Sequence, residues 1–309
     1  MSSRTAISQI ARDNTAGAAE VLLSAVDVYS LLAEEWSKSE CSSVEHAMRR
    51  VIEASVALVE AQPAMAPLAR LASAVVGAAT GLSRADETLD QAEAAAQSFA
   101  QQAASAGEAA SAHAADLIHD GARVFTHSRS STVLLAFKLA LKAGKRFTVI
   151  ATESRPMMEG RALAAEVSRE GAGVTLIADA AAAQGIAQAD FVFLGADWVT
   201  TSKVVNKIGT RLIALAARES GRPIHVVCDT SKFIGSTEGF HEDLRPQGRF
   251  ELRSDPLDEI EVLNSYFEAT PLSLFKSIIT EHGAMRPEET ARLAEQFVLH
   301  RRLLEGITR

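Results

Sequence analysis

A short apolar run and a run with helical spacing are separated by one polar segment, Gly195-Ala-Asp-Trp-Val-Thr-Thr-Ser-Lys-Val-Val-Asn-Lys-Ile-Gly-Thr210. The apolar residues 191–194 predict a strand, and residues 211–219 predict a helix. Asp197 therefore falls at the carboxyl end of a strand, which is the edge where open α/β sheets bind ligands. We interpret the segment as a loop that carries a binding site.

The second half of the chain alternates β-rich runs with helical runs, which is typical of a parallel sheet with crossover helices. The predicted helices begin near Ser131, Glu159, Ala180, Thr210 and Ser236. Residues 271–304 predict two further helices, the second starting after Pro287. The predicted strands are 123–126, 147–152, 173–178, 191–194 and 224–228, and a late strand includes residues 261–263.

The first half, from residue 5 to residue 118, is rich in Ala, Leu, Glu and Gln at helical spacing. Breaks at 37–43, 62–63 and 83–86, with Pro63 suited to a first helical turn, predict about four or five helices. The almost low-complexity residues 87–118 read as a linker or as one long helix, and the absence of Pro favours the helix. We expect an α/β protein with a helical N-terminal domain, 1–118, and a parallel-sheet domain, 119–309.

Composition excludes several classes of function. The 309 residues carry a net charge of -8, from 31 basic and 39 acidic residues, which argues against a nucleic-acid surface. Cys41 and Cys228 lie far apart, and the eight histidines show no paired spacing, so we expect neither a disulfide framework nor a metal site. No signal-type or membrane-spanning apolar run occurs, which predicts a soluble, cytoplasmic protein.

The unusual polar clusters of the second half all follow predicted strands. Because the carboxyl ends of parallel strands share one edge, such clusters can surround one small ligand. Neither a GxGxxG nor a Walker motif follows the first strand of this half, so we predict no cofactor. The clusters are Thr126-His-Ser-Arg-Ser-Ser131, Thr152-Glu-Ser-Arg155, Asp179, Asp197 and Asp229-Thr-Ser-Lys232.

Each of these clusters also has a plain structural interpretation. Ser130 or Ser131 can simply cap a helix, Glu153 and Arg155 can form an exposed ion pair, and Asp197 can cap a turn. Asn206-Lys207 can be a solvated turn, and Lys232 has the same ambiguity, although a lysine at a strand end can also bind a phosphate or a sugar oxygen. His127 and Cys228 are interpreted as packed side chains rather than as a base and a reactive thiol. The convergence of the clusters favours a ligand site, with Thr126, Arg129, Ser130, Ser131, Glu153, Arg155, Asn206, Lys207 and Lys232 as candidate ligand-binding residues.

Four motifs resemble the alpha/beta/delta subunit family of translation initiation factor 2B, which has two sugar-phosphate isomerases among its relatives. They are residues 126–134, 149–156, Gly195-Ala-Asp197 and Asn206-Lys-Ile-Gly-Thr210, with weaker similarity at residues 266–271 and 13–18. The resemblance implies a helical N-terminal domain, a Rossmann-like C-terminal domain that forms a homodimer, and a sugar-phosphate or nucleotide pocket between them.

The resemblance also implies an acid/base couple of a cysteine and an aspartate in the isomerases. Asp197 matches the aspartate, but Ser128 stands where the cysteine is expected. A serine hydroxyl exchanges its proton near neutral pH only with a neighbouring base, so cysteine-type isomerisation is not expected. Ala16-Gly17-Ala18 and Gln62-Pro63 stand where the isomerases carry arginine-containing segments that grip phosphate.

Three functions are compatible with these residues. The first is a non-catalytic or regulatory protein that binds a phosphorylated sugar or nucleotide. The second is an aldose-ketose isomerase of a sugar 1-phosphate, such as ribose 1,5-bisphosphate or methylthioribose 1-phosphate, with Asp197 and Ser128 as catalytic residues or with Cys228 in place of Ser128. The third is a scaffold that binds a protein partner through its helical domain. No nucleic-acid or membrane partner is expected.

Overall fold

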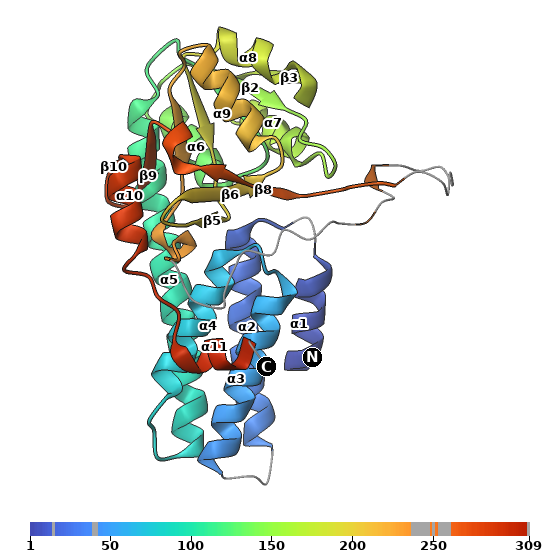
Figure 1. Cartoon of the computed structure of the whole chain (residues 1–309), viewed down its shortest axis with the longest axis vertical. Helices are drawn as coiled ribbons and strands as arrows, with labels where there is room; N and C mark the ends of the chain where they lie inside the picture. Colours follow the sequence, from blue (N-terminus) through green and yellow to red (C-terminus); the bar gives the residue numbers. More distant parts are fainter. Residues whose placement is uncertain (14–15, 39–42, 236–247, 249–250, 253–260, 308–309) are drawn as a thin grey trace. The chain divides into compact units, whose positions relative to one another are not determined.

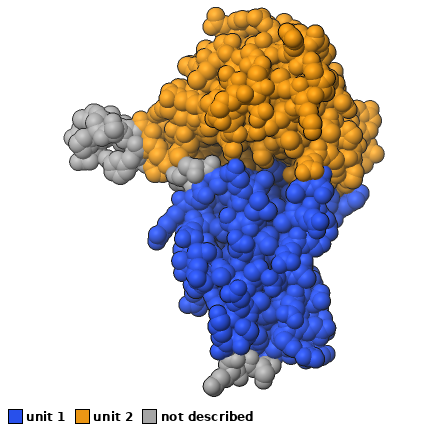
Figure 2. Space-filling model, turned by 180° about the vertical axis from the view of Figure 1, so that it is seen from behind, with its two compact units in different colours: residues 1–105, 231–242, 294–309 blue, residues 106–230, 243–293 orange. Residues whose placement is uncertain are grey.

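The computed structural model describes residues 1–13, 16–38, 43–235, 248, 251–252 and 261–307. The chain forms two compact units that are discontinuous in sequence (Figure 2). Unit 1 contains residues 1–105, 231–242 and 294–309, and unit 2 contains residues 106–230 and 243–293. The predicted division into two continuous domains, 1–118 and 119–309, stays a prediction.

Unit 1 is helical, as the composition predicts. Its first four helices, α1 (Ser3–Arg12), α2 (Ala18–Ser37), α3 (Val44–Ala61) and α4 (Ala66–Ala79), pack against one another through buried Ala, Val and Leu side chains. The Ala-rich segment forms the long helix α5 (Ala85–Leu117), and the unit boundary falls inside it. Pro63 lies in the turn between α3 and α4, and it is Pro67 that occupies the first turn of α4. The prediction for Pro63 is therefore wrong, because a second proline four residues later starts the helix.

Unit 2 contains a sheet of seven strands within the described residues, in the order β10-β9-β7-β4-β1-β2-β3. Figure 1 labels β2, β3, β9 and β10 of this sheet. Only β10 runs antiparallel to its neighbour. The five strands predicted between residues 123 and 228 are confirmed, two of them to the residue. The strands are β1 (Arg123–Thr126), β2 (Thr148–Thr152), β3 (Gly173–Ile177), β4 (Phe191–Leu194), β7 (Ile224–Val227), β9 (Ser277–Thr280) and β10 (Gly283–Met285).

Helices cover both faces of this sheet because alternate strand residues point to opposite sides. Val124, Val149 and Phe193 share one buried cluster with residues of α5, α6 (Ser131–Lys142) and α7 (Glu159–Arg169). On the other face α8 (Ala182–Gln188) lies so close that a Cβ on its Gly185 would be 3.2 Å from Phe125 and 3.1 Å from Ile150. The helix α9 (Thr210–Glu219) packs against α8. Unit 2 is therefore the Rossmann-like three-layer fold that was predicted.

A second, antiparallel sheet replaces the predicted loop after β4. It consists of β5 (Trp198–Val199), β6 (Lys203–Lys207) and β8 (Phe267–Pro271), with β6 in the middle. Interpretation of residues 195–210 as a loop is thus wrong, because β6 pairs with β8, a strand remote in sequence. Asn206 and Lys207 lie at the end of a strand, opposite Glu268 and Phe267.

The C-terminal part differs from its prediction in three places. Residues 261–263 are not a strand, and β8 begins at Phe267. Residues 271–285 form a short 3-10 turn, η4 (Leu272–Leu274), followed by β9 and β10 rather than a helix. The second predicted helix is confirmed as α10 (Pro287–Ala294), and α11 (Arg301–Ile307) follows it. The helix predicted near Ser236 lies outside the described residues.

Within the described part of the chain, the helices lack any window that is both long and apolar enough to cross a bilayer.

His225 on β7 gives the sheet a predicted pH response. Burial, with a smaller contribution from the charge of Lys276, lowers the pKa of His225 to about 4, and Nδ1 hydrogen-bonds to the Ser277 hydroxyl at 2.8 Å. As the pH falls, the unfolded state, with a histidine pKa near 6.5, binds the proton before the folded state does. The contribution of His225 to the free energy of unfolding is therefore fully present above that pKa and is lost as the pH drops toward 4.

We expect His225 to contribute a loss of about 2 kcal/mol in unfolding free energy between pH 7 and pH 5. Urea denaturation at both pH values measures this loss in the wild type and in His225→Asn, where it should shrink by that amount. An equal loss in both proteins would contradict the prediction.

Candidate functional site

The candidate site lies at the point where the order of the strands in the unit 2 sheet reverses. The strands β1 and β4 are neighbours, although the chain visits β2 and β3 between them. Ligands bind at such a switch point because the connecting loops leave it to opposite sides. Ser128 follows β1 and Asp197 follows β4. The two loops touch, since a Cβ on Gly195 would lie 2.6 Å from the Cβ of Ser130.

Three non-glycine residues with left-handed backbone lie in the loops after β1 and β2. They are Ser128 (φ 68°), Ser154 (φ 65°) and Met158 (φ 59°). Such a conformation costs roughly 1–2 kcal/mol for an L-residue. The amide of Ser128 donates to the hydroxyl of Ser154 at 2.8 Å, so two of the strained residues hold each other. Strain of this kind concentrates at functional sites.

His127 joins the loops through a directed set of hydrogen bonds. Its Nε2 lies 2.8 Å from the carbonyl oxygen of Ile208, which only accepts, so Nε2 carries the proton and Nδ1 accepts from the Thr152 hydroxyl at 2.5 Å. Ser154 in turn lies 3.1 Å from that hydroxyl. Burial lowers the pKa of His127, which keeps the ring neutral. The interpretation of His127 as a packed, hydrogen-bonded residue is confirmed.

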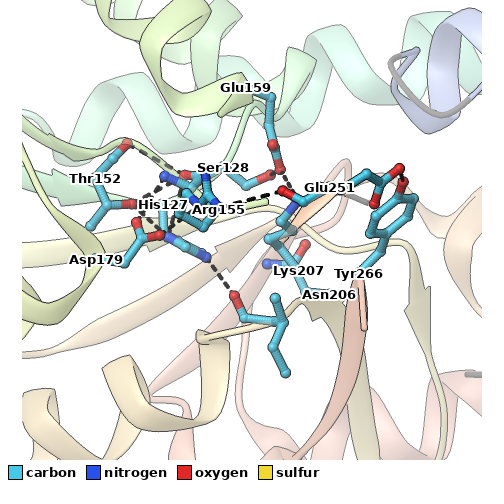
Figure 3. A network of polar contacts seen from close by, with 12 residues as sticks. His127, Ser128, Thr152, Arg155, Glu159, Asp179, Asn206, Lys207, Glu251 and Tyr266 are labelled. Atoms are coloured by element: carbon cyan, nitrogen blue, oxygen red, sulfur yellow. Dashed lines mark hydrogen bonds and ion pairs between the residues drawn. The ribbon is translucent and has the colours of Figure 1, made fainter. Parts of the chain in front are cut away.

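Glu159, the first residue of α7, connects Ser128 with Lys207 (Figure 3). Its Oε1 accepts from the Ser128 hydroxyl at 2.8 Å and lies 2.7 Å from the Lys207 Nζ. The Lys207 side chain is 6% exposed and that of Glu159 is 19% exposed, so the ion pair is largely removed from water. The other carboxylate oxygen, Oε2, is buried and has no hydrogen-bond partner among the described residues. This oxygen can therefore accept a hydrogen bond from a donor that the described residues do not supply.

The ammonium group of Lys207 also faces an aromatic ring. Its Nζ lies 5.4 Å from the centroid of Tyr266, within the range of a cation–π contact. The hydroxyl of Tyr266 donates to Glu251, and the backbone carbonyl of Glu251 accepts from the guanidinium of Arg155 at 3.4 Å (Figure 3). These contacts bring Arg155 into the same network as Lys207.

Asp197 and Asn206 reach this region through the β5–β6 hairpin. The amide of Asp197 donates to the carbonyl of Val205 at 2.9 Å, which sets the half-buried aspartate beside the end of β6. Asn206 is buried, and its Nδ2 donates to the Thr210 hydroxyl at 3.0 Å. The contacts connect Ser128 with Lys207 through Glu159, and Arg155 joins them through Glu251 and Tyr266. Asn206 precedes Lys207 on β6, and the role of the Asp197 side chain in this group stays a prediction.

The remaining predicted residues of unit 2 have structural contacts. Ser130 caps α6 by accepting from the amide of Val133, and Ser131 is exposed on the first turn. Arg129 pairs with Glu166 at 2.9 Å, and Glu153 pairs with Arg161 at 2.6 Å rather than with Arg155. Thr126 is buried at the end of β1. Their roles in ligand binding stay predictions.

Three other residues named from the sequence have structural surroundings of their own. Lys232 is buried in the 3-10 turn η2 (Thr230–Lys232) and belongs to unit 1. Gln62, also in unit 1, donates to the carbonyl oxygens of Ile10 and Asp13 and so binds the end of α1. Cys228 is fully buried after β7, and its amide donates to Ile279, which agrees with a structural thiol.

Sequence reasoning missed Glu159, Tyr266 and Glu251, and it left Asp179 out of the candidate set. The carboxylate of Asp179 accepts from the amides of Ser154 and Arg155 at 2.8 and 2.7 Å and shapes the loop after β2. The sequence did contain a sign that Glu159 could belong to the site, because it is the first residue of a helix that follows a polar loop at a strand end. In the described ranges no group of three or more His, Cys, Asp or Glu side chains is arranged to hold a metal ion.

The fold and the site define a class: a protein with a helical unit and a Rossmann-like unit that carries a buried polar network at the carboxyl ends of its strands. Residues 16–287 match the model of the Initiation factor 2 subunit family. The chain belongs to this family, which confirms the resemblance to translation initiation factor 2B and its relatives.

The sequence of the chain is similar to those of two kinds of sugar-phosphate isomerase. It is 39% identical over 181 residues to a ribose 1,5-bisphosphate isomerase of Archaeoglobus fulgidus, a match that covers 55% of this chain and 56% of the relative. It is 34% identical over 221 residues to a methylthioribose-1-phosphate isomerase of Syntrophotalea carbinolica, with 65% and 64% covered. The matches therefore span less than two thirds of these isomerases.

A solved structure matches over nearly the whole length. The translation initiation factor eIF-2B of Pyrococcus horikoshii superposes with a TM-score of 0.80 at 29% identity, covering 92% of this chain and 97% of that one. Isomerases and an initiation factor thus share this fold, and the fold alone does not separate the two functions.

Proposed function

We propose that the chain binds a phosphorylated sugar or a nucleotide at the carboxyl ends of β1 and β4 and serves a regulatory role. The observation that carries this proposal is the hydrogen-bonded group of Ser128, Glu159 and Lys207, in which one buried Glu159 oxygen has no partner among the described residues. A buried polar atom without a partner costs free energy, which a ligand hydroxyl or amide would recover. The names of the isomerase relatives support a sugar phosphate as the ligand class.

Thermal unfolding with a ligand panel tests this proposal. The panel contains ribose 1,5-bisphosphate, methylthioribose 1-phosphate, nucleoside monophosphates and inorganic phosphate. A ligand at 100 times its Kd stabilises the folded state by about 2.7 kcal/mol and should raise Tm by several degrees. Lys207→Met should abolish the shift, whereas Lys138→Met, which removes a lysine from an exposed ion pair with Glu170, should keep it. An unchanged Tm with every compound at millimolar concentration would reject the proposal.

Aldose-ketose isomerisation is the second candidate function, and one contact favours it. The amide of Asp197 donates to the carbonyl of Val205, the residue before Asn206 and Lys207, which supports an acid/base group close to an amide and an ammonium. Turnover of either sugar phosphate, followed by NMR and lost in Asp197→Asn, would support an isomerase. Binding without turnover would support the regulatory role. Dimerisation and a protein partner for the helical unit stay predictions.

A further inference from the structure

The hydroxyl of Ser128 has the neighbouring base that serine chemistry requires. A serine hydroxyl is a poor proton donor or acceptor unless a base is hydrogen-bonded to it. Ser128 Oγ donates to Glu159 Oε1 at 2.8 Å from a residue with left-handed backbone. The contact joins two strand-end loops, because Ser128 follows β1 and Glu159 opens the helix after β2.

The two oxygens of Glu159 differ in what they can still do. Oε1 receives the Ser128 hydroxyl and the Lys207 ammonium, so its lone pairs are engaged. Oε2 is buried and has no hydrogen-bond partner among the described residues. Lys207 lies 2.7 Å from Oε1 and not from Oε2 in this ion pair, and a carboxylate oxygen with free lone pairs can accept a proton. The free oxygen is therefore the one that can exchange a proton with a bound molecule.

We propose that Glu159 is the second catalytic proton-transfer group of this site, acting through Oε2 together with Asp197, while Ser128 and Lys207 hold its other oxygen. This inference rests on the isomerase candidate described above. It assigns to the Glu159 carboxylate the proton transfer that the resemblance implies for a cysteine at the position of Ser128.

Two carboxylates are sufficient for every proton transfer in the isomerisation of a cyclic sugar 1-phosphate. In the conversion to a ketose 1-phosphate, Asp197 carries a proton from carbon 2 to carbon 1. Glu159 carries a proton from the hydroxyl on carbon 2 to the ring oxygen. The bond between carbon 1 and the ring oxygen breaks, the carbonyl forms at carbon 2, and the phosphate stays on carbon 1. Both carboxylates end as they began, and no further reactant is consumed.

The proposal predicts that kcat falls more when Glu159 is replaced than when Ser128 is replaced. General acid–base catalysis contributes about 10²–10⁴ in rate, so Glu159→Gln should lower kcat by about 100-fold or more. Its KM should change by less than about threefold, because Gln keeps the shape and the hydrogen bond to Ser128. Ser128→Ala removes a holding contact and leaves the carboxylate, so kcat should fall by only about tenfold.

The experiment uses the full chain with methylthioribose 1-phosphate and ribose 1,5-bisphosphate, followed by NMR. Glu170→Gln, on the C-terminal cap of the same helix and in an exposed pair with Lys138, is the matched control and should keep wild-type kcat. Glu159→Asp keeps a carboxylate and should retain more activity than Glu159→Gln, which covers the case that the glutamine variant folds poorly.

Three results would overturn the proposal. They are wild-type kcat in Glu159→Gln, a loss that appears only in KM, and a kcat for Ser128→Ala as low as that of Glu159→Gln. The absence of turnover in the wild type would remove the isomerase candidate and this inference together, while a ligand-dependent rise in Tm would still uphold binding.

Discussion

Replacing Gly160 by alanine is expected to lower the free energy of unfolding by about 3 kcal/mol or more, because overpacking against backbone has no cheap relief. A Cβ at this position would lie 2.0 Å from the carbonyl oxygen of Thr152 and 2.6 Å from the hydroxyl of Ser154. The first atom belongs to the backbone of β2, so α7 would have to move away from the sheet. Chemical denaturation of wild type and Gly160→Ala measures the loss.

Gly107 provides the matched control for this experiment. It lies inside α5, and a Cβ there would meet nothing within 4 Å. Alanine is the better helix former, so Gly107→Ala should raise the free energy of unfolding by about 0.5–1 kcal/mol. Equal effects of the two substitutions would show that close approach at Gly160 does not govern the packing of α7.

Lys207→Met is expected to destabilise the protein by about 2–3 kcal/mol, because it leaves the Glu159 carboxylate buried without its cation. The pair is 2.7 Å long, and both side chains are largely buried. Since Glu159 keeps 19% exposure, the effect should fall below that of a fully enclosed pair. Urea denaturation near pH 7 measures it.

A double-mutant cycle separates the ion pair from the packing of the lysine stem. Lys207→Met combined with Glu159→Gln should recover most of the lost stability, because no uncompensated charge then remains. Glu305→Gln removes the carboxylate of an exposed pair with Arg301 and should change stability by less than about 0.5 kcal/mol. A double variant as unstable as Lys207→Met alone would contradict an electrostatic origin.

Local sequence patterns were sufficient for the parallel sheet. The strands β1 and β4 are short β-rich runs bounded by polar segments, and each is fully or almost fully buried. Polar residues directly after such runs lie at the carboxyl edge by topology alone, which is why Ser128 and Asp197 were predicted. The positions followed from strand direction rather than from any knowledge of contacts.

The second sheet was missed because its order comes from distant pairing. The two-residue strand β5 is too short for a pattern, and β6 begins and ends with lysine. The apolar spacing in residues 271–280 also fits a helix, and only pairing of β9 with β7 selects the strand. Glu159 was missed for a related reason: it lies 31 residues from Ser128, and its role depends on that contact.

The positive φ of Ser128 limits which amino acids can occupy this position. A β-branched side chain is costly in left-handed backbone, so valine, isoleucine and threonine are poor replacements there. Small unbranched residues such as serine, cysteine, asparagine or glycine can succeed one another without rebuilding the loop. An exchange of sulfur for oxygen is therefore among the few substitutions that evolution can test at residue 128 while the chain keeps its shape.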